Sequence, residues 1–139
     1  MKNQLDMDIK VPNQTRYLGL IGKIGENIAL TLKNYTDDRD ELAYHINLVL
    51  TEAMTNAIQH ANRNDPNKQV HITINVSENN LCIKVYDQGQ GFDISETNTL
   101  QPDPEEDHGR GVFLIHTLMD SVTYTPCEHG HVLEMNKHL

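Results

Sequence analysis

The segment between residues 70 and 85 limits the fold of this chain more than any other, because it alternates apolar and polar residues twice. The apolar positions are Val70, Ile72, Ile74 and Val76, and then Leu81, Ile83 and Val85 after Asn79-Asn80. Alternation with a period of two puts the apolar side chains on one face of a strand, and the asparagine pair is typical of a tight turn. We therefore predict an antiparallel hairpin whose apolar face is covered by a second layer.

Two helices are predicted ahead of this hairpin. Apolar residues follow helical spacing in the first at Tyr17, Leu20, Ile21, Ile24, Ile28 and Leu32. Asp38 with Glu41 forms an N-terminal capping signal for the second. The buried stripe of the second helix is predicted at Leu42, Ile46, Val49, Ala53 and Ala57. Gly19, Gly22 and Gly25 recur inside the first helix, and simple tolerance explains them more readily than close packing.

The remaining elements complete an α+β pattern. A strand is predicted over 5–11, ended by Pro12, a helix after Gly111, and two short strands around 122–125 and 132–135. The order β-α-α-β-β-α-β-β predicts a two-layer sandwich with the helices on one face of a mostly antiparallel mixed sheet. At 139 residues we expect one domain, 1–139.

Composition excludes several classes of function. A net charge of −9 and a pI near 5.2 argue against nucleic acid as a partner. No apolar run approaches a membrane span, and the N-terminus lacks a signal-peptide core. Cys82 and Cys127 have no framework spacing, which fits free thiols in a cytoplasmic protein.

The helix that ends near residue 60 carries polar residues at a spacing that suits a ligand site. Glu52, Asn56 and His60 are spaced i, i+4, i+8, so an α-helix would project them from one face. A carboxylate and a carboxamide one turn apart can hold Mg²⁺. His60 is interpreted as a packed histidine rather than a metal ligand.

Two glycine motifs follow this helix in the sequence. Asp87-x-Gly89-x-Gly91 falls where a strand ends, and glycines there let a flat or anionic ligand approach the backbone. Gly109-Arg110-Gly111 opens a helix, whose free N–H groups favour phosphate. Together with the Glu52–His60 helix, they describe a nucleotide pocket.

The segment between the two glycine motifs, 94–108, carries two prolines and five acids without a lysine or arginine. Long structureless segments in compact domains are usually lids or disordered. We interpret this one as a mobile lid, with an idle loop as the alternative. Near the C-terminus, Cys127-x-His129-x-His131 could supply ligands for a transition metal, but it lacks the paired spacing of structural zinc sites.

The three motifs, in this order, resemble those of the GHKL (histidine-kinase-like) ATPase superfamily. The closest resemblance is to the bacterial anti-sigma-factor serine/threonine kinases, on Glu52–Ala61 (the N-box), Asp87–Asp93 and Gly109–Asp120 (two glycine boxes). The family often has Gly-Thr in its last hairpin, where this chain has Gly130-His131.

The resemblance implies a role for each matching residue. Asn56 would ligate the Mg²⁺ that bridges the ATP phosphates, and Glu52 would be the general base. Asp87 would accept a hydrogen bond from the adenine amino group. Residues bordering the nucleotide would be Gly89 and Gly91 at the base and Gly109, Arg110 and Gly111 at the phosphates.

The implied function is an ATP- and Mg²⁺-dependent serine/threonine protein kinase of the anti-sigma type. Its implied partners are an anti-anti-sigma protein that accepts the phosphate, a sigma factor held inactive, and a second copy in a homodimer, with no nucleic acid or membrane. One alternative is a non-catalytic switch gated by ATP or ADP. Another is the stand-alone ATP-binding domain of a two-component histidine kinase, although none of the eight histidines is followed by Glu or Asp.

Overall fold

The computed structural model describes residues 4–33, 35–89 and 107–139. Five strands form one sheet in the order β1-β2-β3-β5-β4. They are β1 (Leu5–Pro12), β2 (Gln69–Ser77), β3 (Asn80–Asp87), β4 (Ser121–Cys127) and β5 (Gly130–His138). Every pairing between neighbouring strands is antiparallel. The predicted hairpin is confirmed, except that its turn lies at 78–79 and Asn80 already belongs to β3.

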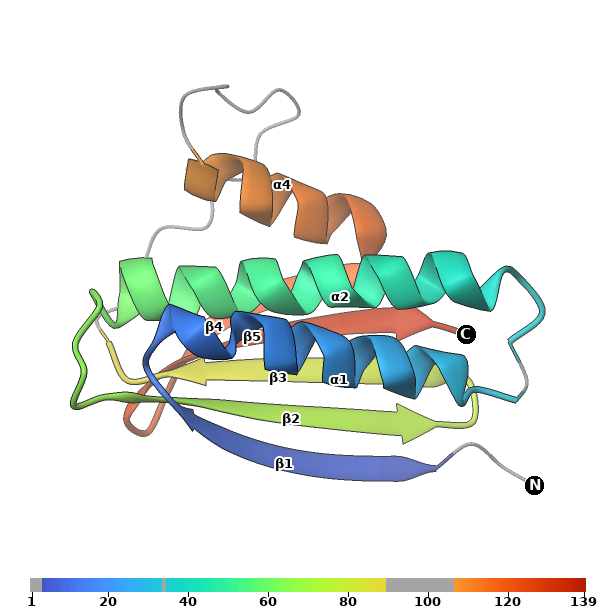
Figure 1. Cartoon of the computed structure of the whole chain (residues 1–139), viewed down its shortest axis with the longest axis horizontal. Helices are drawn as coiled ribbons and strands as arrows, with labels where there is room; N and C mark the ends of the chain where they lie inside the picture. The colour runs from blue at the N-terminus through green and yellow to red at the C-terminus, as the bar shows by residue number, and fades with distance from the viewer. Residues whose placement is uncertain (1–3, 34, 90–106) are drawn as a thin grey trace.

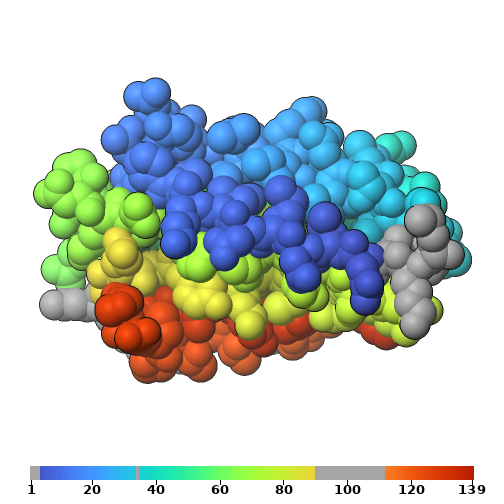
Figure 2. All heavy atoms as spheres, turned by 90° about the horizontal axis from the view of Figure 1, so that it is seen from below, coloured from blue at the N-terminus to red at the C-terminus, as the bar shows by residue number. Residues whose placement is uncertain are grey.

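The helices form the second layer of the sandwich (Figure 1). They are η1 (Thr15–Tyr17), a 3₁₀ turn, α1 (Leu18–Leu30), α2 (Arg39–Thr55), the π-helical turn η2 (Asn56–Ala61), and α4 (Asp107–Leu118). Helix α2 lies between α1 and α4 and contacts both. The α+β sandwich predicted from the sequence is therefore confirmed. Strand β1 forms one edge of the sheet, where it pairs with β2, and it is seen on the side of the molecule shown in Figure 2.

The hydrophobic core of the described residues lies between the two layers. The apolar positions of β2 and β3 that the alternation singled out are all buried, and so is the predicted stripe of α2. Asp38 caps α2 as predicted, since its side chain accepts hydrogen bonds from the backbone N–H groups of Asp40 and Glu41 at 2.9 and 3.3 Å. In the described part of the chain, no helix has both the length and the apolar character needed to cross a membrane.

Two of the three glycines in α1 serve close helix packing, so the interpretation of simple tolerance is wrong for them. A Cβ atom at Gly25 would lie 2.3 Å from Leu50 Cδ1, and one at Gly22 would lie 2.5 Å from Asn47 Oδ1. A Cβ atom at Gly19 would meet nothing within 4 Å, so tolerance does explain this third glycine. The absence of side chains at Gly22 and Gly25 lets α1 approach α2 closely.

The end of the second helix differs from the prediction. The chain leaves α-helical geometry at Asn56, and the N–H of Asn62 donates to the carbonyl of Ala57, five residues back, at 2.8 Å. Single π turns of this kind occur frequently at functional sites. The i, i+4, i+8 spacing assumed a continuous α-helix, so it does not give the direction of His60.

Candidate functional site

The three predicted motifs lie at the same end of the molecule (Figure 1). The turn η2, the last residues of β3 and the first residues of α4 all lie there, together with the turn between β4 and β5. Turn η2 packs against β3, and α2 packs against α4. The fold therefore brings together segments that are spread over residues 56 to 129 of the sequence.

Glu52 and Asn56 lie on consecutive turns at the end of α2. Glu52 is half-buried in the last turn of α2, and Asn56, the first residue of η2, is 1% exposed. The Asn56 Nδ2 atom is buried and has no hydrogen-bond partner among the described residues. A buried polar atom without a partner is costly, and a bound ligand is one explanation for it.

These residues fit an Mg²⁺–nucleotide complex. Mg²⁺ is usually bound by one or two protein oxygens together with substrate phosphates and several waters. The carboxamide of Asn56 offers one such oxygen, and its nitrogen can donate to an anionic ligand. The described residues contain no group of three or more His, Cys, Asp or Glu side chains that could hold a metal ion by themselves.

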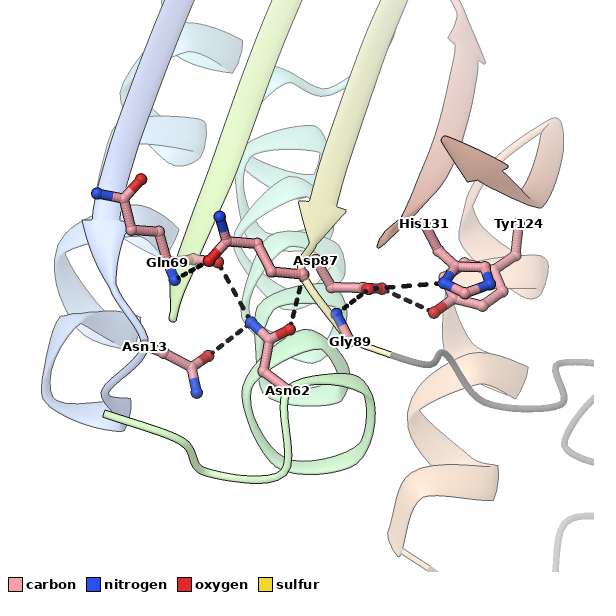
Figure 3. A network of polar contacts seen from close by, with 8 residues as sticks. Asn13, Asn62, Gln69, Asp87, Gly89, Tyr124 and His131 are labelled. Atoms are coloured by element: carbon pink, nitrogen blue, oxygen red, sulfur yellow. Dashed lines mark hydrogen bonds and ion pairs between the residues drawn. The ribbon is translucent and has the colours of Figure 1, made fainter. Parts of the chain in front are cut away.

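Asp87 ends β3 with its side chain on the core side of the sheet. It is 3% exposed, and its carboxylate accepts hydrogen bonds from the Gly89 N–H at 3.0 Å and the Tyr124 hydroxyl at 2.7 Å. Figure 3 shows both contacts. A carboxylate has about four acceptor positions, so capacity for a ligand donor remains. Tyr124 has no counterpart among the sequence-based site predictions.

Gly89 makes the closest approach between two of the motifs. A Cβ atom there would lie 1.7 Å from the carbonyl oxygen of Ala61, the last residue of η2. Only glycine fits this position without displacing the backbone of η2 or of the loop. The glycine predicted to border a ligand therefore also joins the strand end to the end of the N-box helix.

Asn62 connects three segments around this junction and was not among the predicted site residues. It is fully buried, and its Nδ2 donates to Asn13 Oδ1 at 3.0 Å and to the carbonyl of Gln69 at 3.2 Å. Its Oδ1 accepts from the Gln88 N–H at 2.8 Å. The network, drawn in Figure 3, fixes the residue that follows Asp87 relative to β1 and β2.

His131 lies opposite Asp87 in the pairing of β3 with β5. Its ring stacks on Tyr124 with the centroids 5.1 Å apart and the planes at 14°. Its Nδ1 atom is 3.8 Å from Asp87 Oδ1. The preceding residue, Gly130, packs on the Asp87 backbone, since a Cβ atom there would lie 2.1 Å from the Asp87 carbonyl oxygen.

The second glycine box lies inside a helix rather than ahead of it. Helix α4 begins at Asp107, so the helix start predicted at Gly109 lies two residues too late. Gly109 and Arg110 are still among the first four residues, whose N–H groups have no partner within the helix. Gly91 and the predicted lid, apart from its last two residues, lie outside the described residues.

The three residues of the Cys-x-His-x-His motif do not share one environment. Cys127 and His129 are exposed, whereas His131 lies beside Asp87. Cys127 and the half-buried Cys82 are free thiols, and burial raises the pKa of Cys82. His60 is half-buried within η2, and its interpretation as a packed residue stays a prediction.

Comparisons with known proteins agree with this geometry. Residues 28–137 match the family model described as histidine kinase-like ATPase domain. The chain is 35% identical to the serine-protein kinase RsbW of Bacillus subtilis (strain 168), over 88% of this chain and 79% of that protein. It is 27% identical to the anti-sigma F factor of Anoxybacillus flavithermus (strain DSM 21510 / WK1), over 100% of this chain and 94% of that protein.

A solved structure supports the fold. The histidine kinase domain from the Erythrobacter litoralis EL346 blue-light activated histidine kinase superimposes with a TM-score of 0.57 at 23% identity. The match covers 91% of this chain and 61% of that one. An α+β sandwich with a glycine-rich strand end beside a polar helix end defines this class of ATPase domain. The chain belongs to the histidine kinase-like ATPase domain family, which confirms the resemblance seen in its motifs.

Proposed function

We propose that this protein is an ATP- and Mg²⁺-dependent serine/threonine protein kinase of the anti-sigma-factor type. The observation that carries the proposal is the buried carboxamide of Asn56, which has an unsatisfied atom and lies one helical turn from Glu52. The names of the relatives support the same activity, since several are called serine-protein kinase and one is called an anti-sigma factor.

In this proposal each of the predicted site residues has its own role in phosphoryl transfer. Asp87 accepts a hydrogen bond from the adenine amino group, and Gly89 and Gly91 border the base. Gly109, Arg110 and Gly111 contact the phosphates through backbone N–H groups and the arginine charge. Mg²⁺, held by Asn56 and the phosphates, would neutralise the developing negative charge.

Glu52 is proposed as the general base. The hydroxyl oxygen of a serine or threonine on the acceptor forms a bond to the γ-phosphorus, and the bond to the bridging oxygen of ADP breaks. The proton of the hydroxyl passes to the Glu52 carboxylate. Positioning and an oriented nucleophile account for most of the catalysis in reactions of this type.

The proposed partners follow from the same class of protein. They are a small anti-anti-sigma protein as phosphate acceptor, a sigma factor, and a second copy of this chain bound through a face away from the nucleotide. A cytoplasmic location and a single domain over 1–139 stay predictions of the same kind. The competing function is a switch that binds nucleotide without transferring phosphate.

Labelling separates the two functions. The protein is incubated with γ-labelled ATP and a bacterial cytosolic extract, and the labelled protein and residue are identified by mass spectrometry. We expect a labelled serine or threonine. Glu52→Gln should bind ATP but lose transfer by about 10²–10⁴-fold, the usual share of general-base catalysis. Asn56→Ala should lose Mg²⁺-dependent ATP binding.

The matched control is Glu41→Gln, the same chemical change at an exposed position of the same helix. It should label its acceptor as the unmutated protein does. A stable complex with a partner that never gains phosphate would favour the switch, and a labelled histidine would favour the histidine-kinase alternative.

A further inference from the structure

The residue that departs from the family pattern in the last hairpin, His131, has an unexplained nitrogen. The Nδ1 atom of His131 is buried and has no hydrogen-bond partner among the described residues. It lies 3.8 Å from Asp87 Oδ1, which is too far for a hydrogen bond. A native structure rarely buries such a group without a use for it.

The surroundings fix the ring and leave this nitrogen facing the Asp87 carboxylate. Stacking on Tyr124 holds the plane of the imidazole, with the centroids 5.1 Å apart. The Tyr124 hydroxyl donates to Asp87 Oδ2, so it is Oδ1 that faces Nδ1. Figure 3 shows the histidine ring and the carboxylate beside the end of β3.

Either ring nitrogen of a histidine can carry hydrogen and donate a hydrogen bond. With its hydrogen on Nδ1, His131 presents a donor beside the Asp87 carboxylate. Asp87 Oδ1 is an acceptor. The two residues therefore present an acceptor and a donor next to each other, from strands β3 and β5.

We propose that His131 helps to select the base. Its Nδ1 donates a hydrogen bond to N1 of adenine, while Asp87 accepts a hydrogen bond from the 6-amino group. This inference rests on the proposed function and adds a second determinant of base selectivity to it. Guanine carries an acceptor at position 6 and a hydrogen on N1, so both contacts would be mismatched. Sites that hydrogen-bond a ligand group discriminate strongly against analogues that lack it.

The test compares ligands as well as variants. Calorimetry is run with ADP, 1-deaza-ADP, which lacks the N1 acceptor, and 7-deaza-ADP, which keeps it. The unmutated protein should bind 1-deaza-ADP about 10-fold more weakly than ADP, the upper range for one neutral hydrogen bond, and 7-deaza-ADP about equally. His131→Ala should bind ADP about 10-fold more weakly and no longer distinguish it from 1-deaza-ADP.

His129→Ala is the matched control, since His129 lies in the same hairpin with its side chain 79% exposed. It should keep the preference for ADP. His131→Asn, which restores a donor, should recover part of that preference. Equal binding of ADP and 1-deaza-ADP by the unmutated protein overturns the inference even if His131→Ala fails to fold.

The outcomes separate this inference from the proposed function. Tight ADP binding without any N1 discrimination removes the base-reading role of His131 and leaves the kinase proposal intact. Failure of the unmutated protein to bind ADP overturns both.

Discussion

Gly89 lies so close to Ala61 that a Cβ atom on the glycine would be 1.7 Å from the alanine carbonyl oxygen. The contact joins the loop after β3 to the last residue of η2. Asp87, whose Oδ1 accepts the Gly89 N–H at 3.0 Å, is tied to the same junction. The orientation of the buried carboxylate therefore depends on the absence of a side chain two residues later.

Gly89→Ala should disturb this junction. The added methyl group cannot fit without moving backbone, so we expect a loss of about 1–3 kcal/mol in the free energy of unfolding, as for other overpacked sites. Affinity for ADP should also fall, because Asp87 shifts with the loop. Urea unfolding and calorimetry measure the two effects. Unchanged stability and affinity would contradict the described contact.

Asn62→Ala should be strongly destabilising. It removes the partners of Asn13 Oδ1, the Gln69 carbonyl and the Gln88 N–H at a fully buried position. Each buried group left unsatisfied costs about 1–3 kcal/mol, so a total loss of at least about 2 kcal/mol is expected in urea unfolding. Asn67→Ala, at an exposed position in the same turn, is the control and should change stability by less than about 0.5 kcal/mol.

The glycines of α1 should respond in opposite directions to the same substitution. Gly25→Ala places a methyl group against Leu50 and should destabilise the protein by about 1–3 kcal/mol. Gly19→Ala meets open space and should be neutral or stabilising by up to about 1 kcal/mol, since alanine favours a helix. Thermal or urea unfolding of the two variants checks this. Equal effects would argue against the close approach of α1 to α2.

His116 should make the protein less stable in mild acid. Burial lowers the pKa of His116, so the folded protein keeps the imidazole neutral where the unfolded chain already protonates it, near pH 6.5. The unfolded state then binds more protons, and the free energy of unfolding falls as the pH drops through this range.

Urea unfolding between pH 7.5 and 5.5 measures this effect. His116→Gln should show a shallower fall in stability than the unmutated protein over that range. His129→Gln, at an exposed histidine, should keep the original slope. An identical slope in the unmutated protein and His116→Gln would contradict the role assigned to burial.

The elements that could be predicted from the sequence are those with local signals. Alternation predicted the β2–β3 hairpin, and Asp38 predicted the start of α2. Both signals are local, because the alternation of side chains along a strand and the capping of a helix depend on residues close in the sequence. The position of Asp87 at the end of a strand followed from the same alternation, whereas the predicted α-helix ran past Asn56, where α2 has already ended. Their roles in binding remain predictions.

The features that could not be predicted depend on tertiary arrangement. Nothing in the run of asparagines at 62, 64 and 67 distinguishes the buried Asn62 from its exposed neighbours. Tyr124 reaches Asp87 although β5, which follows β4 in the chain, lies between β4 and β3 in the sheet. The glycine spacing in α1 hinted at close packing, but only the position of α2 decides which glycines need it.

The π turn from Asn56 to Ala61 makes the length of this segment as important as its composition. An α-helix turns by about 100° per residue, so deleting one residue here would rotate everything beyond it by roughly that angle. The hydrogen bonds of Asn62 and the contact between Gly89 and Ala61 would then be lost together. We infer that this segment accepts substitutions at exposed positions such as Gln59, whereas an insertion or deletion of a single residue would disconnect the site from the sheet.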